Sequence, residues 1–158
     1  MKSVLFVCTG NTCRSPLAEA LFRDLVKDRE DYHVTSAGLG AYGGQPASKH
    51  SVALAATRGL DLTGHRSRPV TPALVNAATH IFAMSGNHLA VIESDFPEAA
   101  EKAYLVSEFC ADDRLRGADV PDPFGMHLSD YQAVLGSLDI MLPSVFAYIE
   151  QTWKPQSE

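Results

Sequence analysis

The sequence contains little cysteine, little basic charge and no long apolar run. Only three cysteines occur among 158 residues, and this small, odd number excludes a framework of paired disulfides. Thirteen Lys and Arg residues against nineteen Asp and Glu give a formal net charge of -6, so no overall positive field would attract nucleic acid or an anionic membrane. We therefore expect neither nucleic acid nor a membrane as a partner.

The apolar segments are short. The N-terminal run SVLFVC is too short for a signal core or a membrane span, and no later apolar run approaches the roughly 18 residues of a membrane helix. Together with the few cysteines, this predicts a reducing, cytoplasmic setting. No internal repeat or linker is visible and 46% of the residues are hydrophobic, which predicts one domain over residues 1–158.

Short apolar runs alternate along the chain with segments of helical spacing. The pattern predicts strands at 4–7, 33–38, 79–84 and 102–106 and helices at 15–26, 48–59, 71–78, 85–96 and 129–153. Ser15, Thr71 and Ser85 are expected as N-caps, and Pro143 is expected to kink or interrupt the last helix. This alternation predicts a doubly wound α/β sheet, which binds ligands at the carboxyl ends of its strands.

The segment CTGNTCRS, residues 8–15, forms the turn between the first strand and the first helix. Such a turn presents free backbone N–H groups and the positive end of the helix dipole, which suit a phosphate dianion. Gly10 and Asn11 tolerate the left-handed conformations that curl the N–H groups inward. Arg14 adds a planar fork for two phosphate oxygens. The turn is therefore predicted to bind an oxyanion.

Cys8 lies at the mouth of this turn. The N–H groups, the dipole and Arg14 favour its thiolate, which makes it a candidate nucleophile, and Ser15 offers a hydroxyl to that sulfur. A lone cysteine that ends a buried strand is more often an inert core residue. The coincidence of Cys, five residues, Arg and Ser on a strand-to-helix turn favours catalysis over that alternative.

The segment VCTGNTCRSP resembles the N-terminal signature of the low-molecular-weight protein tyrosine phosphatases, and DPFG at 122–125 resembles their later Asp-Pro-aromatic element. SAG, GHRSR and AMSGNHL also fall where that family has similar segments. The resemblance implies a four-stranded parallel sheet with helices on both faces, no metal or other cofactor, and a reaction carried by Cys8, Arg14 and Asp122. It also implies that Ser36 and His65 hydrogen-bond Asn11.

The resemblance further implies a phosphate-binding loop and residues that select the substrate. The loop comprises Thr9, Gly10, Asn11, Thr12, Cys13, Arg14 and Ser15. Tyr42 matches an aromatic position that walls the pocket, whereas Phe124 and Gly125 replace a tyrosine pair of the vertebrate members. Thr12 resembles the bacterial protein-arginine phosphatases of this family, whereas many tyrosine-specific relatives have a larger apolar residue there. We therefore expect a phosphotyrosine phosphatase, with phosphoarginine as the alternative substrate.

Asp122 is also a candidate without the resemblance. A cysteinyl-phosphate mechanism needs an acid that protonates the leaving group and then a base that activates water, and one carboxyl on a loop can do both. Pro123 restricts Asp122 to an extended backbone, a restraint that the other acidic residues of the loop at 107–126 lack. The alternative is an ordinary turn residue, since Asp-Pro is a common turn dipeptide.

Two other classes of function remain open. Arsenate reductases use a similar loop but pass electrons through a downstream cysteine pair, and this chain has only Cys110 beyond the loop. A non-catalytic phosphopeptide-binding module would keep Arg14 but would not need Cys8 or Asp122. The expected partner is thus a phosphorylated protein or peptide, and the expected product is inorganic phosphate. Cys13 either forms a protective reversible disulfide with Cys8 or fills the core.

Overall fold

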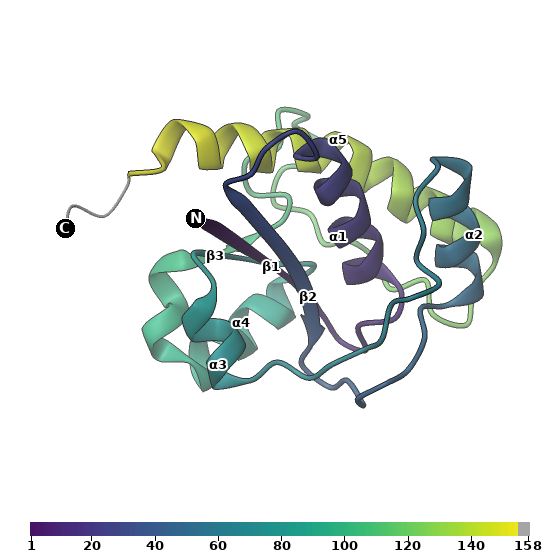
Figure 1. The fold of residues 1–158 in the computed structure, drawn as a ribbon, viewed down its shortest axis with the longest axis horizontal. Helices are drawn as coiled ribbons and strands as arrows, with labels where there is room; N and C mark the ends of the chain where they lie inside the picture. The colour runs from purple at the N-terminus through teal and green to yellow at the C-terminus, as the bar shows by residue number, and fades with distance from the viewer. Residues whose placement is uncertain (155–158) are drawn as a thin grey trace.

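The computed structural model describes residues 1–154 and contains one four-stranded parallel sheet (Figure 1). Its strands are β1 (Lys2–Cys8), β2 (Tyr32–Gly38), β3 (His80–Ala83) and β4 (Ala103–Leu105). The strand order β2-β1-β3-β4 places β1 in the middle of the sheet. Cys8 pairs with Gly38 on β2, and Val7 pairs with Ala83 on β3. The carboxyl ends of three strands therefore meet where the CTGNTCRS turn begins.

Helices cover both faces of this sheet. They are α1 (Arg14–Leu25), α2 (Lys49–Thr57), α3 (Pro72–Ala77), α4 (Gly86–Asp95), the 3-10 helix η1 (Pro97–Lys102) and α5 (Leu128–Thr152). In Figure 1, α1, α2 and α5 lie on one side of the sheet, and α3 and α4 lie on the other. Side chains alternate along β1, so Val4 and Phe6 join one apolar core and Leu5 and Val7 join the second. The predicted doubly wound fold is confirmed.

The start of α1 differs from the expectation. The helix begins at Arg14, with Cys13 as its N-cap and no side-chain capping bond. Ser15 is not a cap, because its hydroxyl is turned into the loop toward Cys8 and Asn11. Thr71 and Ser85 do cap α3 and α4 as predicted, each accepting a hydrogen bond from the backbone N–H three residues on. The 3-10 helix η1 was not anticipated by the apolar pattern.

The last helix, α5, runs without interruption through Pro143. Pro143 is exposed, while Leu142 and Val145 beside it are buried, so packing holds the chain helical on both sides of the proline. By length and mean hydropathy alone, α5 could also cross a membrane, although its sequence contains no uninterrupted apolar run of that length. The core helix of a globular protein passes the same test, and α5 packs against α1 and α2.

Candidate active site

The loop of residues 8–15 closes around the Cys8 sulfur. Its Sγ lies 2.9 Å from the Ser15 Oγ, and the backbone N–H of Asn11 donates to it at 3.3 Å. A pocket of about 210 Å³ opens above this sulfur. Its lining residues are Cys8, Thr9, Gly10, Thr12, Cys13, Arg14, Asp122 and Phe124. The fold thus brings the predicted nucleophile, arginine and carboxylate to one small cavity.

Asn11 holds the loop in this shape. It is fully buried, with a left-handed φ of 56°. Its side-chain amide donates to the Ser15 Oγ at 2.8 Å and to the Ser36 Oγ at 2.9 Å. The side-chain oxygen accepts from the backbone N–H of Arg68 at 3.0 Å, and the backbone oxygen lies 2.7 Å from the His65 Nε2. The contacts that the family resemblance implied for Ser36 and His65 are therefore present.

Gly38 allows the loop to approach β2 closely. A Cβ at this position would lie 2.4 Å from the Thr9 carbonyl oxygen and 2.9 Å from the Asn11 nitrogen. Both contacts involve backbone atoms, which do not move aside as a flexible side chain does. The glycine of the SAG segment is therefore a steric requirement of the loop of residues 8–15.

Arg14 is buried behind the pocket with one edge of its guanidinium occupied. Its Nη1 donates to the Val120 carbonyl at 3.0 Å, and its Nη2 lies 3.7 Å from Oδ2 of Asp122. Within residues 1–154, the buried Nε of Arg14 has no hydrogen-bond partner. An unpaired buried N–H is costly, so the guanidinium is suited to an anion that enters the pocket.

Asp122 also lines the pocket, with 53% of its side chain exposed. Its Oδ1 accepts a hydrogen bond from the backbone N–H of Phe124 at 3.1 Å. The carboxylate therefore makes the local turn that the alternative interpretation predicts, and its other oxygen faces Arg14. The turn thus occupies one carboxylate oxygen of Asp122 and leaves the other beside Arg14 at the pocket.

The three proposed specificity residues lie at different distances from the Cys8 pocket. Thr12 and Phe124 line that pocket and also a neighbouring hollow of about 490 Å³, to which Tyr42, Pro46 and Ala47 contribute. Tyr42 lines only this second hollow, and 82% of its surface is exposed. Tyr42 therefore lies at the outer edge of the site and does not line the pocket above Cys8.

All three cysteines are free, buried thiols. Cys13 Sγ lies 3.5 Å from the Tyr131 hydroxyl, on the side where α1 meets α5. Burial is the main cause that raises the pKa of Tyr131, so its hydroxyl keeps its proton beside that sulfur. Within the described chain, no group of three or more His, Cys, Asp or Glu residues is arranged to hold a metal ion.

His88 is a residue of the site that the sequence did not single out. Its Nε2 lies 2.8 Å from the Thr9 Oγ1, so it contacts the second residue of the loop. It belongs to the AMSGNHL segment, and the only available signal was the position of that segment just after the third strand. Burial, followed by the positive charge of Arg14, lowers the pKa of His88.

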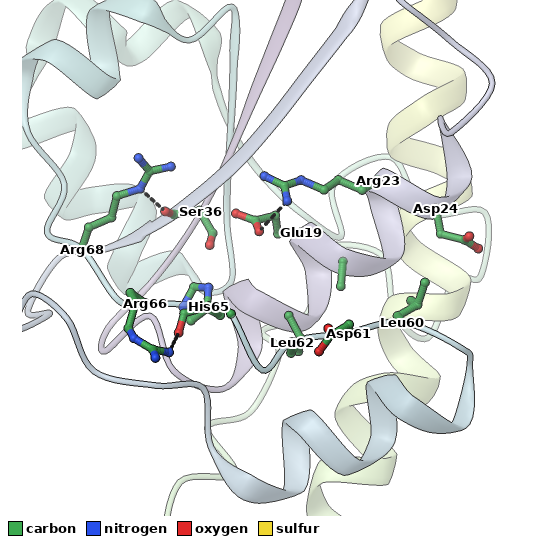
Figure 2. Close-up of a pocket in the computed structure, with 12 residues that line it drawn as sticks. Glu19, Arg23, Asp24, Ser36, Leu60, Asp61, Leu62, His65, Arg66 and Arg68 are labelled. Atoms are coloured by element: carbon green, nitrogen blue, oxygen red, sulfur yellow. Dashed lines mark hydrogen bonds and ion pairs between the residues drawn. The ribbon is translucent and has the colours of Figure 1, made fainter.

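A larger hollow of about 620 Å³ lies behind the loop, against α1 and the segment that follows α2 (Figure 2). Ser36, His65 and Arg68 form part of its wall, and the same three residues contact Asn11. Three arginines and three carboxylates line it, so it favours neither sign of charge. Glu19 lies within it and pairs with Arg23 at 3.6 Å (Figure 2). Residues that line this hollow hold the loop in place, and no cysteine is among them.

A sequence model of the family described as low molecular weight phosphotyrosine protein phosphatase matches residues 3–154. The chain belongs to this family. It is 36% identical over 139 residues to the protein-arginine-phosphatase of Geobacillus stearothermophilus, covering 88% of this chain and 90% of that one. It is 33% identical over 137 residues to the low molecular weight protein-tyrosine-phosphatase Etp of Escherichia coli K12, covering 87% of each chain.

Solved structures of the family share the whole fold. YwlE arginine phosphatase from Geobacillus stearothermophilus superposes with a TM-score of 0.85 at 31% identity, covering 99% of this chain and 100% of that one. The low molecular weight protein tyrosine phosphatase from T. tengcongensis gives a TM-score of 0.85 at 36% identity, covering 94% and 99%. The chain is thus a hydrolase of the protein phosphatase class, and both substrate types occur among its relatives.

Proposed function

We propose that this phosphatase removes phosphate from phosphotyrosine in proteins through a covalent intermediate on Cys8. The proposal rests on the contacts of the Cys8 sulfur, which accepts a hydrogen bond from the Asn11 N–H and lies 2.9 Å from the Ser15 hydroxyl. Both groups stabilise a thiolate by donating hydrogen bonds to it. A thiolate at the base of a phosphate-sized pocket is placed for attack on phosphorus.

The reaction then proceeds in two displacements. The Cys8 sulfur forms a bond to phosphorus while the bond to the tyrosyl oxygen breaks, and protonated Asp122 gives its proton to that oxygen. Asp122 next takes a proton from water as the water oxygen attacks phosphorus, which releases inorganic phosphate and regenerates the thiolate. Arg14 and the N–H groups of the loop stabilise the phosphoryl oxygens in both steps.

The rim of the pocket supports an aromatic substrate. Apolar surface lies next to the phosphate pocket and is formed by Phe124, Tyr42, Pro46 and Ala47. A tyrosyl ring gains free energy when its faces leave water against such surface. The substrate is thus a phosphorylated protein or peptide, and the free thiols of this chain favour a cytoplasmic setting in which cysteines stay reduced.

Phosphoarginine is the second candidate, and Thr12 favours it. The Thr12 side chain lies on the rim between the two hollows, where its hydroxyl can accept a hydrogen bond from a guanidinium N–H. A buried guanidinium needs such acceptors, whereas a phenyl ring does not. Two of the relatives are named protein-arginine-phosphatases.

The deciding experiment measures kcat/KM on matched phosphotyrosine and phosphoarginine peptides for the wild-type protein and for Cys8→Ser. We expect turnover of phosphotyrosine by the wild type and none by Cys8→Ser, because a hydroxyl is a far weaker nucleophile than a thiolate. Cys8→Ser should still bind inorganic phosphate, since the loop N–H groups and Arg14 remain. Near-normal turnover by the variant would contradict the covalent role of Cys8, and a wild-type preference for phosphoarginine would reverse the order of the two substrates.

A further inference from the structure

The His88 side chain joins the first turn of α4 to the phosphate-binding loop. Only 7% of the residue is exposed, and both ring nitrogens are within hydrogen-bond distance of a hydroxyl. Nε2 lies 2.8 Å from the Thr9 Oγ1, and Nδ1 lies 2.8 Å from the Ser85 Oγ. Thr9 in turn is exposed and lines the pocket above Cys8. The ring therefore connects the cap of α4 with a hydroxyl that faces the reaction site.

The cap of α4 favours one direction for these hydrogen bonds. The Ser85 Oγ accepts the backbone N–H of His88 at 3.3 Å, so the proton of that hydroxyl is free to point at Nδ1 of the ring. A neutral ring that accepts at Nδ1 carries its proton on Nε2 and donates it to the Thr9 Oγ1. The Thr9 hydroxyl then acts as an acceptor toward His88, and its own proton is directed elsewhere.

The charged groups around the ring favour its neutral form. Burial lowers the pKa of His88 most, and the positive charge of Arg14 lowers it further. Asp119 and Asp122 act in the opposite direction but do not cancel these two effects. The lowered pKa favours a neutral ring near pH 7, which carries a single proton on its two nitrogens. With Nδ1 accepting from Ser85, that proton lies on Nε2.

Thr9 is also held from its other side. Its carbonyl oxygen accepts the backbone N–H of Gly40 at 2.9 Å, so the segment after β2 fixes the Thr9 backbone while His88 fixes its hydroxyl. Thr9 lines the pocket together with Cys8 and Asp122, so its hydroxyl proton can point at a phosphate group held there. A neutral O–H donor on this rim adds to the backbone N–H groups and the guanidinium of Arg14.

We propose that His88 is a positioning residue that orients the Thr9 hydroxyl as a hydrogen-bond donor to the phosphate group held above Cys8. The inference rests on the proposed phosphatase function and adds two side chains to its binding machinery. Because a hydrogen bond to a charged group is stronger than one between neutral groups, its loss should weaken phosphate binding by about tenfold.

The test compares variants that remove or keep each partner. The probes are inorganic phosphate, bound in calorimetry, and an aryl phosphate, used for kcat/KM. We expect Thr9→Val to weaken phosphate binding and to lower kcat/KM by about tenfold, and Thr9→Ser to keep most of both, since it retains the hydroxyl. His88→Leu should cause the same loss as Thr9→Val, and His88→Gln should recover most of it, because its amide N–H reaches the position of Nε2.

The double variant shows whether the two residues act through each other. In the Thr9→Val background, His88→Leu should add little further loss, because its partner hydroxyl is already absent. His80→Leu is the matched control: this buried ring lies 2.8 Å from the Thr79 hydroxyl, at the opposite end of β3 from the loop. It should lower the temperature of unfolding without changing phosphate binding.

Two results would overturn the inference. One is unchanged phosphate binding in Thr9→Val, and the other is losses for Thr9→Val and His88→Leu that multiply in the double variant. If His88→Leu does not fold, Thr9→Val against Thr9→Ser and wild type against His88→Gln still decide the matter. Absence of wild-type turnover on the aryl phosphate would instead contradict the proposed function, and the calorimetric comparison distinguishes the two failures.

Discussion

At the scale of single residues, the candidate catalytic groups of the loop are held in place by a buried amide. Asn11 makes hydrogen bonds to Ser15 and Ser36 through its nitrogen and to Arg68 through its oxygen. A buried polar side chain with every partner in place is rigid, and its loss leaves several groups unsatisfied. The position of the Asn11 backbone N–H beside the Cys8 sulfur follows from this network.

The exchange Asp122→Asn separates acid catalysis from binding. An amide cannot give a proton to the leaving group, so we expect hydrolysis of phenolate esters with poor leaving groups to slow by roughly two to four orders of magnitude. The rate should fall much less for esters whose leaving group departs without protonation. A leaving-group series of aryl phosphates measures this difference, with Asp113→Asn, a change at an exposed acid of the same loop, as the control. Equal losses across the series would assign Asp122 to the turn alone.

The exchange Thr12→Ile tests the choice of substrate. It removes the hydroxyl that would accept a guanidinium N–H and adds apolar surface, so kcat/KM for a phosphoarginine peptide should fall about tenfold or more. The value for a phosphotyrosine peptide should stay unchanged or rise. Thr12→Ser, which keeps the hydroxyl, is the matched control. A ratio of the two kcat/KM values that does not move would exclude Thr12 from specificity.

Two of the candidate catalytic residues could be proposed from the sequence because they lie close together in the chain. Cys8 and Arg14 stand on one turn, and the strand-to-helix order around them indicates an oxyanion site. His88 could not be found in the same way, since its contact with Thr9 joins segments 79 positions apart. Nothing in the neighbourhood of His88 in the sequence indicates which hydroxyl its Nε2 meets.

At the scale of elements, the site depends on how closely β2 approaches the loop after β1. Cys8 and Gly38 are paired at the ends of the two strands, and the chain then continues with Leu39 donating to the Cys8 carbonyl at 2.9 Å. Parallel neighbours bring their carboxyl ends to the same edge of the sheet. The missing side chain at Gly38 lets the loop backbone occupy the space beside β2.

Gly38→Ala should therefore disturb the loop by direct contact. The added methyl would meet backbone atoms of Thr9 and Asn11, so we expect a loss of about 1 to 3 kcal/mol in the free energy of unfolding. Activity should fall further than stability explains, because Asn11 shifts with the loop. Urea unfolding and kcat/KM on one aryl phosphate measure the two effects, with Gly43→Ala, which meets nothing within 4 Å, as the control. Wild-type behaviour of Gly38→Ala would refute the steric role.

Element boundaries followed the sequence where local capping decided them and failed where tertiary contacts did. Thr71 and Ser85 cap their helices through bonds to residues three positions later, a purely local arrangement. Ser15 is also a typical capping residue and is followed by a proline. Its hydroxyl instead contacts the Cys8 sulfur and accepts a hydrogen bond from the Asn11 side chain. Contacts within the loop thus displaced the local preference at the start of α1.

At the scale of the whole molecule, the end of the sheet opposite the active site is closed by an ionic and aromatic cluster. Lys2 is buried there, pairs with Asp31 at 2.6 Å and Glu150 at 3.1 Å, and lies over the ring of Trp153. The hydrogen bond to Lys2 is the main cause that lowers the pKa of Asp31, and the hydrogen bond to Arg29 is the main cause that lowers the pKa of Glu150. The C-terminal part of α5 is thereby fixed to the start of β1.

His80 makes this end of the molecule sensitive to acid. Its ring packs against Phe82 and Trp153 and bonds to the Thr79 hydroxyl at 2.8 Å. Burial, and then the charge of Lys2, lowers the pKa of His80 from its ordinary 6.5 to about 4. Between these two values the unfolded chain takes up a proton that the folded protein does not. The free energy of unfolding must therefore decrease as the pH falls through this window, and the decrease from His80 ends below the lower value.

His80→Phe removes this titration and keeps an aromatic ring in the same place. Between about pH 7 and about pH 4.5, we expect the wild type to lose on the order of 1 to 2 kcal/mol more stability than the variant. Carboxyl groups such as Glu150 also destabilise the fold in acid when they take up protons, but they are present in both proteins and cancel in the difference. Urea unfolding at the two pH values provides the measurement. Parallel pH dependence of the two proteins would show that His80 is protonated in the fold as readily as in the unfolded chain.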